Sequence, residues 1–287
     1  IYGYQHIPAT PLRGQTTQGG VSPMKALKDR AARLLTGMGY LEIMNFSFTG
    51  VKEIQKLGLP EGDLRNDPMP ILNPLGEDAA VMRPTLACGM LHTLAFNMNH
   101  STPAARLYEM AAVFDHHHRT DEGLPTETQT LCLGAYGPEE DFFTVKGAME
   151  ALAAGFDLTF TYERETAPWL HPGISAAVYC NGKRLGVFGK LSNEINGELE
   201  IAKDQKDSQN IYLGELDYEA LMSCVDGELR YKPLSPYAAV KRDLALVCEE
   251  KVTCGEIEDT IKKASSLITE VKLFDICLLY TSPSPRD

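Results

Sequence analysis

The stretch SAAVYCNGKRLGVFGKL, residues 175–191, contains the clearest structural pattern in the chain. Two runs that alternate apolar and polar residues flank Asn181 and Gly182, a dipeptide that suits a two-residue type I′ turn. The alternation gives each run one apolar face and one polar face, as expected for half-buried strands. The stretch therefore predicts an antiparallel β-hairpin.

Strands and helices are interspersed on both sides of this hairpin. Further strands are predicted at residues 40–49, 106–114, 128–137 and 211–217, and further helices at residues 23–38, 86–98, 145–156 and from Asp217 onward. Within the first of these strands, Met44, Phe46 and Phe48 alternate with polar residues, so we expect them to form its buried face. This mixture indicates an α+β domain with a mainly antiparallel sheet.

The helix that opens this domain has a well-defined start. Ser22 can cap its first turn, and Pro23 suits the first helical position. An apolar stripe follows at helical spacing, formed by Met24, Leu27, Ala31, Leu34, Leu35 and Met38. Such a stripe covers the chain's own sheet or meets a partner protein, and the sequence leaves both interpretations open.

Residues 229–276 have the pattern of a separate, smaller unit. Residues 239–250 and 268–276 are predicted strands, and the helix between them places Ile257 and Ile261 on its inward face. A strand–helix–strand unit this short is typical of a split βαβ, ferredoxin-like domain. The sequence supplies only the first half of that fold, so we expect a truncated domain.

Charge and cysteine content exclude several classes of protein. The 287 residues carry a formal net charge of −12, which opposes binding to nucleic acid, but residues 229–276 balance eight Lys/Arg against eight Asp/Glu. Seven scattered cysteines without a CxxC pair indicate reduced thiols in a cytoplasmic protein, with no zinc or disulfide framework. No apolar run approaches the ~20 residues that span a bilayer, so no membrane association is expected.

Several segments share a family pattern, in the same order along the chain: IYGYQHIP (1–8), LNPLGEDAAVMRPTLACGMLHTLAFNMNH (72–100), RLYEMAAVF (106–114), LHPGISAAVYCNGKRLGVFGKL (170–191) and YKPLSPYAAVKRDLALV (231–247). Together they resemble the bacterial-type β subunit of phenylalanyl-tRNA synthetase. GMGYLEIMNF (37–46) also resembles the first signature of class II synthetases, with Phe46 where that signature usually has proline. The resemblance implies a class II synthetase-like core followed by a ferredoxin-like anticodon-binding domain.

The resemblance divides the chain into four parts. Residues 1–20 are the exit of a preceding domain and a linker, 21–228 a noncatalytic synthetase-like core, and 229–276 a partial anticodon-binding domain. The remaining residues, 277–287 (CLLYTSPSPRD), are similar to the translated read-through of a sequencing adapter, and we expect them to be an artefact of assembly. The first residue is Ile1, so we expect the chain to start inside a longer reading frame, with the family's editing domain and magnesium ligands upstream.

The resemblance also implies a role in attaching phenylalanine to tRNA-Phe, as a scaffold for a catalytic α subunit in an (αβ)₂ heterotetramer. Catalytic class II members place arginines in their second and third signatures to hold ATP. Here Glu109 occupies the centre of the matching strand, Arg106 stands at its edge, and residues 211–221 lack a GxGxxR pattern. We therefore expect no catalytic residue in this fragment, with ATP and Mg²⁺ used by the holoenzyme and bound elsewhere.

Two sets of residues are predicted to contact partners. The subunit-interface set consists of Met24, Leu27, Ala31, Leu34 and Met38, and the tRNA-binding set consists of Tyr231, Lys232, Tyr237, Lys241 and Arg242. In the second set, cations suit phosphates and aromatic rings suit exposed bases. An alternative for Arg242 is an ion pair with Asp243 or with another domain.

Other polar clusters are expected to have no catalytic or metal-binding role. His116–His118 lie in a polar stretch that reads as a solvated loop, and three consecutive side chains on a strand cannot face one ion. Residues 77–78 and 139–141 are expected to be exposed acidic turns. Cys88 and His92 lack a visible third partner for nucleophilic catalysis. Trp169 and His171 fit a packed loop before the hairpin.

Two other functions remain as alternatives. An independent ATP-using ligase would need phosphate-binding arginines, which the signatures lack. A free-standing RNA-binding or scaffold protein would use a synthetase-like core without an α subunit. Exchange of pyrophosphate into ATP by the chain alone would support the first alternative, and a solitary gene with no neighbouring α-subunit gene would favour the second.

Overall fold

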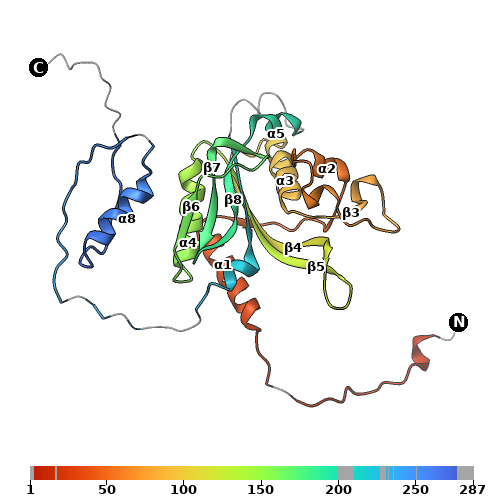
Figure 1. Cartoon of the computed structure of the whole chain (residues 1–287). Coiled ribbons are helices and arrows are strands. Elements are labelled where there is room, and N and C mark those ends of the chain that lie inside the picture. Colours follow the sequence, from red (N-terminus) through yellow and green to blue (C-terminus); the bar gives the residue numbers. More distant parts are fainter. Residues whose placement is uncertain are drawn as a thin grey trace, which may run out of the picture. The chain divides into compact units, whose positions relative to one another are not determined.

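The computed structural model describes residues 3–16, 18–199, 210–226, 231, 233–234, 236–249 and 251–276 (Figure 1). The α-helices are α1 (Pro23–Gly37), α2 (Val51–Gln55), α3 (Ala87–Asn99), α4 (Phe142–Ala154), α5 (Asn193–Glu198), α7 (Tyr218–Met222) and α8 (Cys254–Ala264). The strands are β1 (Leu41–Glu42), β2 (Phe48–Thr49), β3 (Val81–Met82), β4 (Ala105–Arg119), β5 (Pro125–Tyr136), β6 (Phe160–Glu163), β7 (Leu170–Cys180), β8 (Lys183–Leu191) and β9 (Ile211–Asp217). Short 3₁₀ helices are η1 (Tyr4–His6), η2 (Leu64–Asn66) and η3 (Glu77–Ala79). None of these described helices is long and apolar enough to cross a membrane.

Contacts along the chain divide it into two compact units, Ile1–Glu228 and Leu229–Asp287. The first unit is built on a seven-stranded sheet in the order β1-β4-β5-β9-β8-β7-β6 (Figure 1). Every pairing in it is antiparallel except β1 with β4. β2 and β3 form a separate antiparallel pair. The predicted mixture of helices with a mainly antiparallel sheet is therefore confirmed.

Each face of the large sheet packs against its own set of helices. Because successive side chains of a strand point to opposite faces, Tyr108 and Met110 join one buried cluster while Leu107 joins the other. The first cluster includes residues of α1, α4 and α7, and the second includes residues of α2, α3 and α5. The centre of the sheet is therefore covered on both sides by this chain.

Local sequence signals form the elements that they predict. Asn181 and Gly182 have φ values of 50° and 77°, as a type I′ turn requires, and join β7 to β8. Ser22 Oγ accepts a hydrogen bond from the Lys25 amide at 3.3 Å, with Pro23 as the first residue of α1. The predictions of this hairpin and of the α1 start are both confirmed.

The single strand predicted at residues 40–49 is wrong in two respects. Only β1 and β2 are regular, and the intervening residues 43–47 are not part of a strand. Met44 and Phe46 also lie outward, 92% and 88% exposed, while Ile43, Asn45 and Ser47, which alternate with them, lie inward and are half-buried. The inward residues are held by backbone bonds: the Ile43 amide donates to the Tyr108 carbonyl at 2.8 Å, and the Ser47 carbonyl accepts from the Arg83 amide at 2.9 Å.

The loop predicted at His116–His118 is also wrong, because β4 continues to Arg119. The register of β4 with β5 shifts between Asp115 and Arg119. The pairing with β5 carries the strand through polar residues that would not form one alone. The turn that follows contains Gly123 with φ of 78°.

The second unit contains one regular element among its described residues, the helix α8. Its cap is a capping box: Thr253 and Glu256 exchange bonds between side chain and backbone amide. Ile257 and Ile261 are half-buried.

The predicted strands at residues 239–250 and 268–276 are not formed within the described residues. In a split βαβ arrangement these two strands are not neighbours, so neither supplies the other's backbone hydrogen bonds. Residues 277–287 lie outside the described part of the chain.

Candidate functional site

Two carboxylates, one buried and one half-buried, share one row at the centre of the sheet. Glu109 of β4 and Glu215 of β9 both pair in register with Cys132 of β5, which lies between them. The row lies on the face that packs against α3. We call Glu109 and Glu215 the sheet-centre carboxylates. Carboxylates placed here require partners, since burying an unpaired charge costs several kcal/mol or more (about 20 in the idealised limit).

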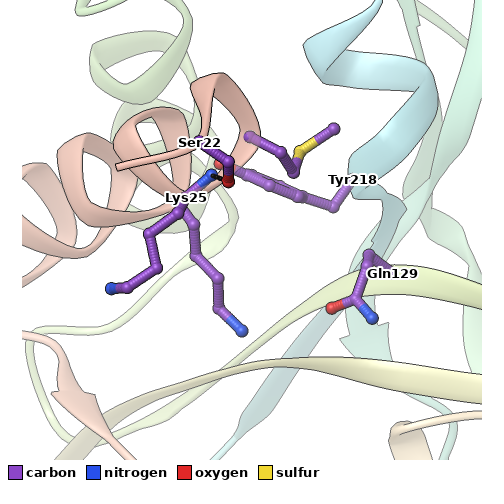
Figure 2. A pocket seen from close by; sticks show the side chains of 6 residues that line it. Ser22, Lys25, Gln129 and Tyr218 are labelled. Carbon is purple, nitrogen blue, oxygen red and sulfur yellow. Dashed lines mark hydrogen bonds between the residues drawn. The ribbon is translucent and has the colours of Figure 1, made fainter. Parts of the chain in front are cut away.

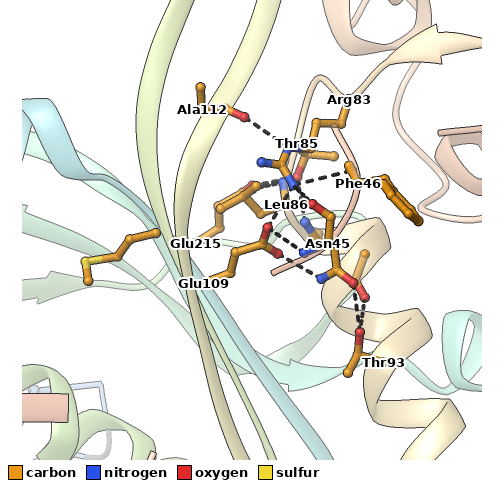
Figure 3. A network of polar contacts seen from close by, with 12 residues as sticks. Asn45, Phe46, Arg83, Thr85, Leu86, Thr93, Glu109, Ala112 and Glu215 are labelled. Atoms are coloured by element: carbon orange, nitrogen blue, oxygen red, sulfur yellow. Dashed lines mark hydrogen bonds and ion pairs between the residues drawn. The ribbon is translucent and has the colours of Figure 1, made fainter. Parts of the chain in front are cut away.

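Glu109 is neutralised by Arg83, which precedes α3 (Figure 3). Arg83 Nη1 lies 2.8 Å from Glu109 Oε1, with the two side chains 8% and 2% exposed. Asn45 donates to both carboxylate oxygens, through its amide at 3.2 Å and its Nδ2 at 2.8 Å. Arg83 also donates to the carbonyls of Ala112, Asn45 and Phe46. One buried ion pair thus fixes the backbone of residues 45–46.

Glu215 is held by the start of α3 (Figure 3). Its carboxylate accepts from Thr85 Oγ1 at 2.7 and 2.8 Å and from the Leu86 amide at 2.7 Å. A negative charge at a helix N-terminus is favourable because the first amides have no partner within the helix. Glu215 therefore anchors α3 to the sheet.

The thiols near the sheet-centre carboxylates are protected from ionisation. Burial, reinforced by the Glu215 and Glu53 carboxylates, raises the pKa of Cys88 to about 12. Burial raises the pKa of Cys132 well above its usual value, and Glu215 and Glu109 add to that rise. A thiolate is the reactive form of cysteine, so neither residue is a nucleophile at neutral pH.

Two further arginines near the sheet are also bound to carboxylates. Arg106 Nε donates to Glu140 Oε1 at 2.7 Å, and the Glu140 side chain is only 6% exposed, so the prediction of an exposed turn is wrong for this residue. Arg65 forms two side-chain bonds to Asp63, at 2.7 and 2.9 Å. Its guanidinium lies 4.8 Å from the centre of the Trp169 ring, which is buried as predicted.

The charge arrangement at the sheet centre opposes binding of a nucleotide. ATP phosphates need cations that are free to contact them, because positioning and electrostatics provide most of such catalysis. Arg65, Arg83 and Arg106 are each neutralised within the chain, and the described residues of the sheet centre present carboxylates instead. The contacts of this site join β4, β9, α3 and residues 45–46.

An exposed apolar surface lies directly outside this network. We define the apolar edge as Met44, Phe46 and Phe48, which are 92%, 88% and 43% exposed. Figure 3 shows the Phe46 side chain pointing away from the Arg83–Glu109 pair. Apolar side chains gathered on a surface and rigidly held from behind are typical of a protein-binding site. The sequence pattern pointed to the same three residues, but as the buried face.

The predicted interface residues of α1 divide by burial. Ala31 is fully buried in the chain's own core, so its side chain is not accessible to a partner. Leu27, Leu34 and Met38 are partly buried against the same core, and Met24 is 43% exposed. Met24 lines a hollow of about 220 Å³ together with Ser22, Lys25, Lys28, Gln129 and Tyr218 (Figure 2).

The predicted tRNA-binding residues lie in the second unit. Tyr231, Tyr237, Lys241 and Arg242 are exposed, and Lys232 lies outside the described residues. Arg242 Nη1 donates to the Lys241 carbonyl at 3.1 Å. Among the described residues, no ion pair joins Arg242 to Asp243. The two cations are thus accessible to an anionic ligand.

Sequence reasoning missed the partners of the sheet-centre carboxylates. Arg83 and Thr85 lie 26 and 130 residues away from the carboxylates that they contact. Glu109 and Glu215 are acidic residues within mainly apolar stretches of their strands, and a buried charge requires a partner. That signal predicts that partners exist, but it does not identify them.

The histidine run also contacts a distant residue. His116 Nε2 and His117 Nε2 each lie 3.4 Å from the same carboxylate oxygen of Asp67, at the end of η2. His118 instead contacts Asp115 through Nδ1 at 2.5 Å. Two of the three consecutive histidines thus face one carboxylate, while the third faces another.

Comparison with known proteins assigns the chain to a family. Residues 7–218 match the family model described as "Phenylalanyl tRNA synthetase beta chain CLM domain". The chain is 34% identical to the phenylalanine–tRNA ligase β subunit of Clostridium tetani, over 96% of this chain and 34% of the relative. The β subunits of Clostridium acetobutylicum and Bacillus subtilis are 31% and 29% identical, each over 96% of this chain and 34% of the relative. The chain thus spans about a third of the length of these relatives. It belongs to the phenylalanyl-tRNA synthetase β-chain family.

Proposed function

We propose that this chain is part of the β subunit of a phenylalanine–tRNA ligase and acts as a noncatalytic scaffold for the catalytic α subunit. The observation that carries the proposal is the pair of sheet-centre carboxylates, bound by Arg83 and by the start of α3. In a catalytic core of this class, that region would present cations to ATP. The role of the chain is therefore to support ATP-dependent attachment of phenylalanine to tRNA-Phe without performing the chemistry.

The proposed partner is the α subunit, in an (αβ)₂ heterotetramer that works in the cytoplasm. ATP and Mg²⁺ would be bound by the α subunit. The apolar edge and Met24 are the surfaces that fit such a partner, because exposed apolar side chains become stabilising once a partner covers them.

Pyrophosphate exchange tests the scaffold role. We expect the chain alone to catalyse no phenylalanine-dependent exchange between ATP and pyrophosphate, because Arg65, Arg83 and Arg106, the described arginines near the sheet centre, are each bound to a carboxylate. Co-expression with a bacterial α subunit should give a complex that does catalyse exchange. Size-exclusion chromatography confirms that the complex has formed before the assay.

Three results would contradict the proposal. Exchange by the chain alone would mean that the core is catalytic. An assembled complex that is no more active than the α subunit alone would mean that the chain does not complete its partner's site. A chain that never assembles with α but binds tRNA would indicate a free-standing RNA-binding protein.

For the second unit, we propose a role in binding the anticodon region of tRNA-Phe. The exposed cations Lys241 and Arg242 suit phosphates, with Lys232 as a further cation outside the described residues. The exposed rings of Tyr231 and Tyr237 suit unstacked bases.

Replacing Lys241 and Arg242 with alanine should weaken binding of tRNA-Phe and flatten its dependence on salt. Each lost phosphate contact reduces the magnitude of the slope of log K against log [salt] by about 0.7–0.9. For the double variant, the magnitude of this slope should therefore be lower by roughly 1.5. Binding is measured by fluorescence anisotropy across a salt series.

The variant Lys262→Ala/Lys263→Ala on α8 is a matched control, because it removes the same charge elsewhere in the unit. An equal change of slope in both variants would indicate non-specific attraction. An unchanged slope for Lys241→Ala/Arg242→Ala would remove these residues from the site.

A further inference from the structure

Three side chains from distant parts of the chain converge beside the β4–β5 hairpin. Asp67 follows η2, and His116 and His117 lie near the end of β4. Each histidine Nε2 is 3.4 Å from Asp67 Oδ2, and the three ligand atoms all lie within 4.8 Å of one another. We call this group the Asp67–His–His cluster.

An irregularity in β4 explains how neighbouring histidines reach one carboxylate. On a regular strand, adjacent side chains point to opposite faces. Here the register shifts after Asp115, whose Oδ1 accepts from the His117 amide at 2.8 Å. The two imidazole rings come to lie 4.3 Å apart between centroids, tilted by 58°. The bulge thus turns both rings toward Asp67.

We propose that the Asp67–His–His cluster binds a divalent transition-metal ion of the zinc type. Two imidazole nitrogens and one carboxylate oxygen are ligands that zinc prefers. Tetrahedral bonds of about 2.0–2.1 Å place neighbouring ligand atoms about 3.3–3.4 Å apart. The two nitrogen–oxygen distances of 3.4 Å match that spacing. Water would fill the fourth position.

An ion in the solvent can reach the three side chains of the cluster. The side chains of Asp67, His116 and His117 are 75%, 18% and 30% exposed, so an ion can reach them. His117 Nε2 also lies 3.2 Å from the Asp67 carbonyl. A metal ion binds only an unprotonated Nε2, so it would displace a proton that lies between His117 Nε2 and this carbonyl.

The bound ion would act as a cross-link. Asp67 and His116 are 49 residues apart in sequence, and the ion would tie the end of the β4–β5 hairpin to the segment after η2. A cross-link that is absent from the unfolded chain stabilises the folded state. This inference does not rest on the proposed scaffold role.

Titration of the chelator-treated full chain with Co²⁺ tests the site. We expect visible absorption bands typical of four-coordinate cobalt that saturate at one equivalent and disappear when Zn²⁺ is added. The variants His116→Ala, His117→Ala and Asp67→Ala should each lower the affinity at least ~10-fold, the loss that even outer-shell changes cause. His118→Ala is the matched control, since that ring contacts Asp115 instead.

Asp67→Ala is the decisive variant because its position is remote in sequence from the histidine run. Equal affinity in Asp67→Ala and the unaltered chain would mean that the histidines alone capture the ion, and the proposed site would be wrong. A stoichiometry other than one Co²⁺ per chain would also contradict the proposed site. As an independent readout, Zn²⁺ should slow proteolysis of the β4–β5 turn in the unaltered chain but not in Asp67→Ala.

Discussion

Replacing Arg83 with methionine is expected to lower the free energy of unfolding by about 3–5 kcal/mol. Methionine fills much of the space that the arginine side chain occupies. It leaves the Glu109 carboxylate, whose side chain is 2% exposed, without its cation. It also removes donors from the carbonyls of Ala112 and Asn45. Urea unfolding followed by the fluorescence of Trp169, the only tryptophan in the chain, measures the loss.

A second variant distinguishes the cost of the unpaired Glu109 charge from the cost of the changed side-chain shape at position 83. Arg83→Met combined with Glu109→Leu should recover a large part of the stability, because an apolar pair often replaces a buried ion pair at little cost. Lys25→Met is the control: it removes the exposed Lys25–Asp29 pair, which contributes no more than about 0.5 kcal/mol. An Arg83→Met effect as small as that of Lys25→Met would contradict the assigned role of Arg83. If Arg83→Met does not fold, folding of the double variant supports the same conclusion.

Replacing both Met44 and Phe46 with aspartate is expected to weaken binding of the α subunit by about 100-fold or more. Central apolar residues of an interface contribute about 2 kcal/mol or more each when they are buried by a partner, and 1.4 kcal/mol corresponds to tenfold in affinity. Both side chains are exposed in this chain, so its own stability should change little. Sedimentation of labelled chain with α subunit measures the affinity.

The control for this prediction carries the same substitutions at other exposed positions. Leu124 lies in the β4–β5 turn and Phe143 in the first turn of α4, and they are 58% and 74% exposed. Leu124→Asp/Phe143→Asp adds the same charge and should leave binding unchanged. Equal losses in the two double variants, or none in Met44→Asp/Phe46→Asp, would exclude the apolar edge as the α-binding surface.

Elements with strong local signals could be predicted from the sequence. Ser22 and Pro23 define the start of α1, and Asn181 and Gly182 define the turn of the β7–β8 hairpin, because capping and left-handed φ depend on a few neighbouring residues. The predicted C-terminal strands are absent from the described residues for the opposite reason. A strand depends on partners that its own sequence does not contain.

The acidic centre of the sheet was only partly predictable. Glu109 in an apolar strand already opposed phosphate binding, but Arg83 and Glu215 were not connected to it. These residues meet only after β4, β5 and β9 align in register. Asp67 and the two histidines are a similar case, since the bulge that turns the rings depends on pairing with β5.

The sequence by itself determined that residues 43–48 alternate between two faces. Only the tertiary structure decided which face is buried. Period-two alternation is symmetric, so it distinguishes two sets of side chains without assigning either set to the core. Arg83, 38 residues away, holds the Asn45 carbonyl, and Glu109 holds the Asn45 amide. Because these buried charges need polar partners, the polar set lies inward and Met44 and Phe46 remain at the surface.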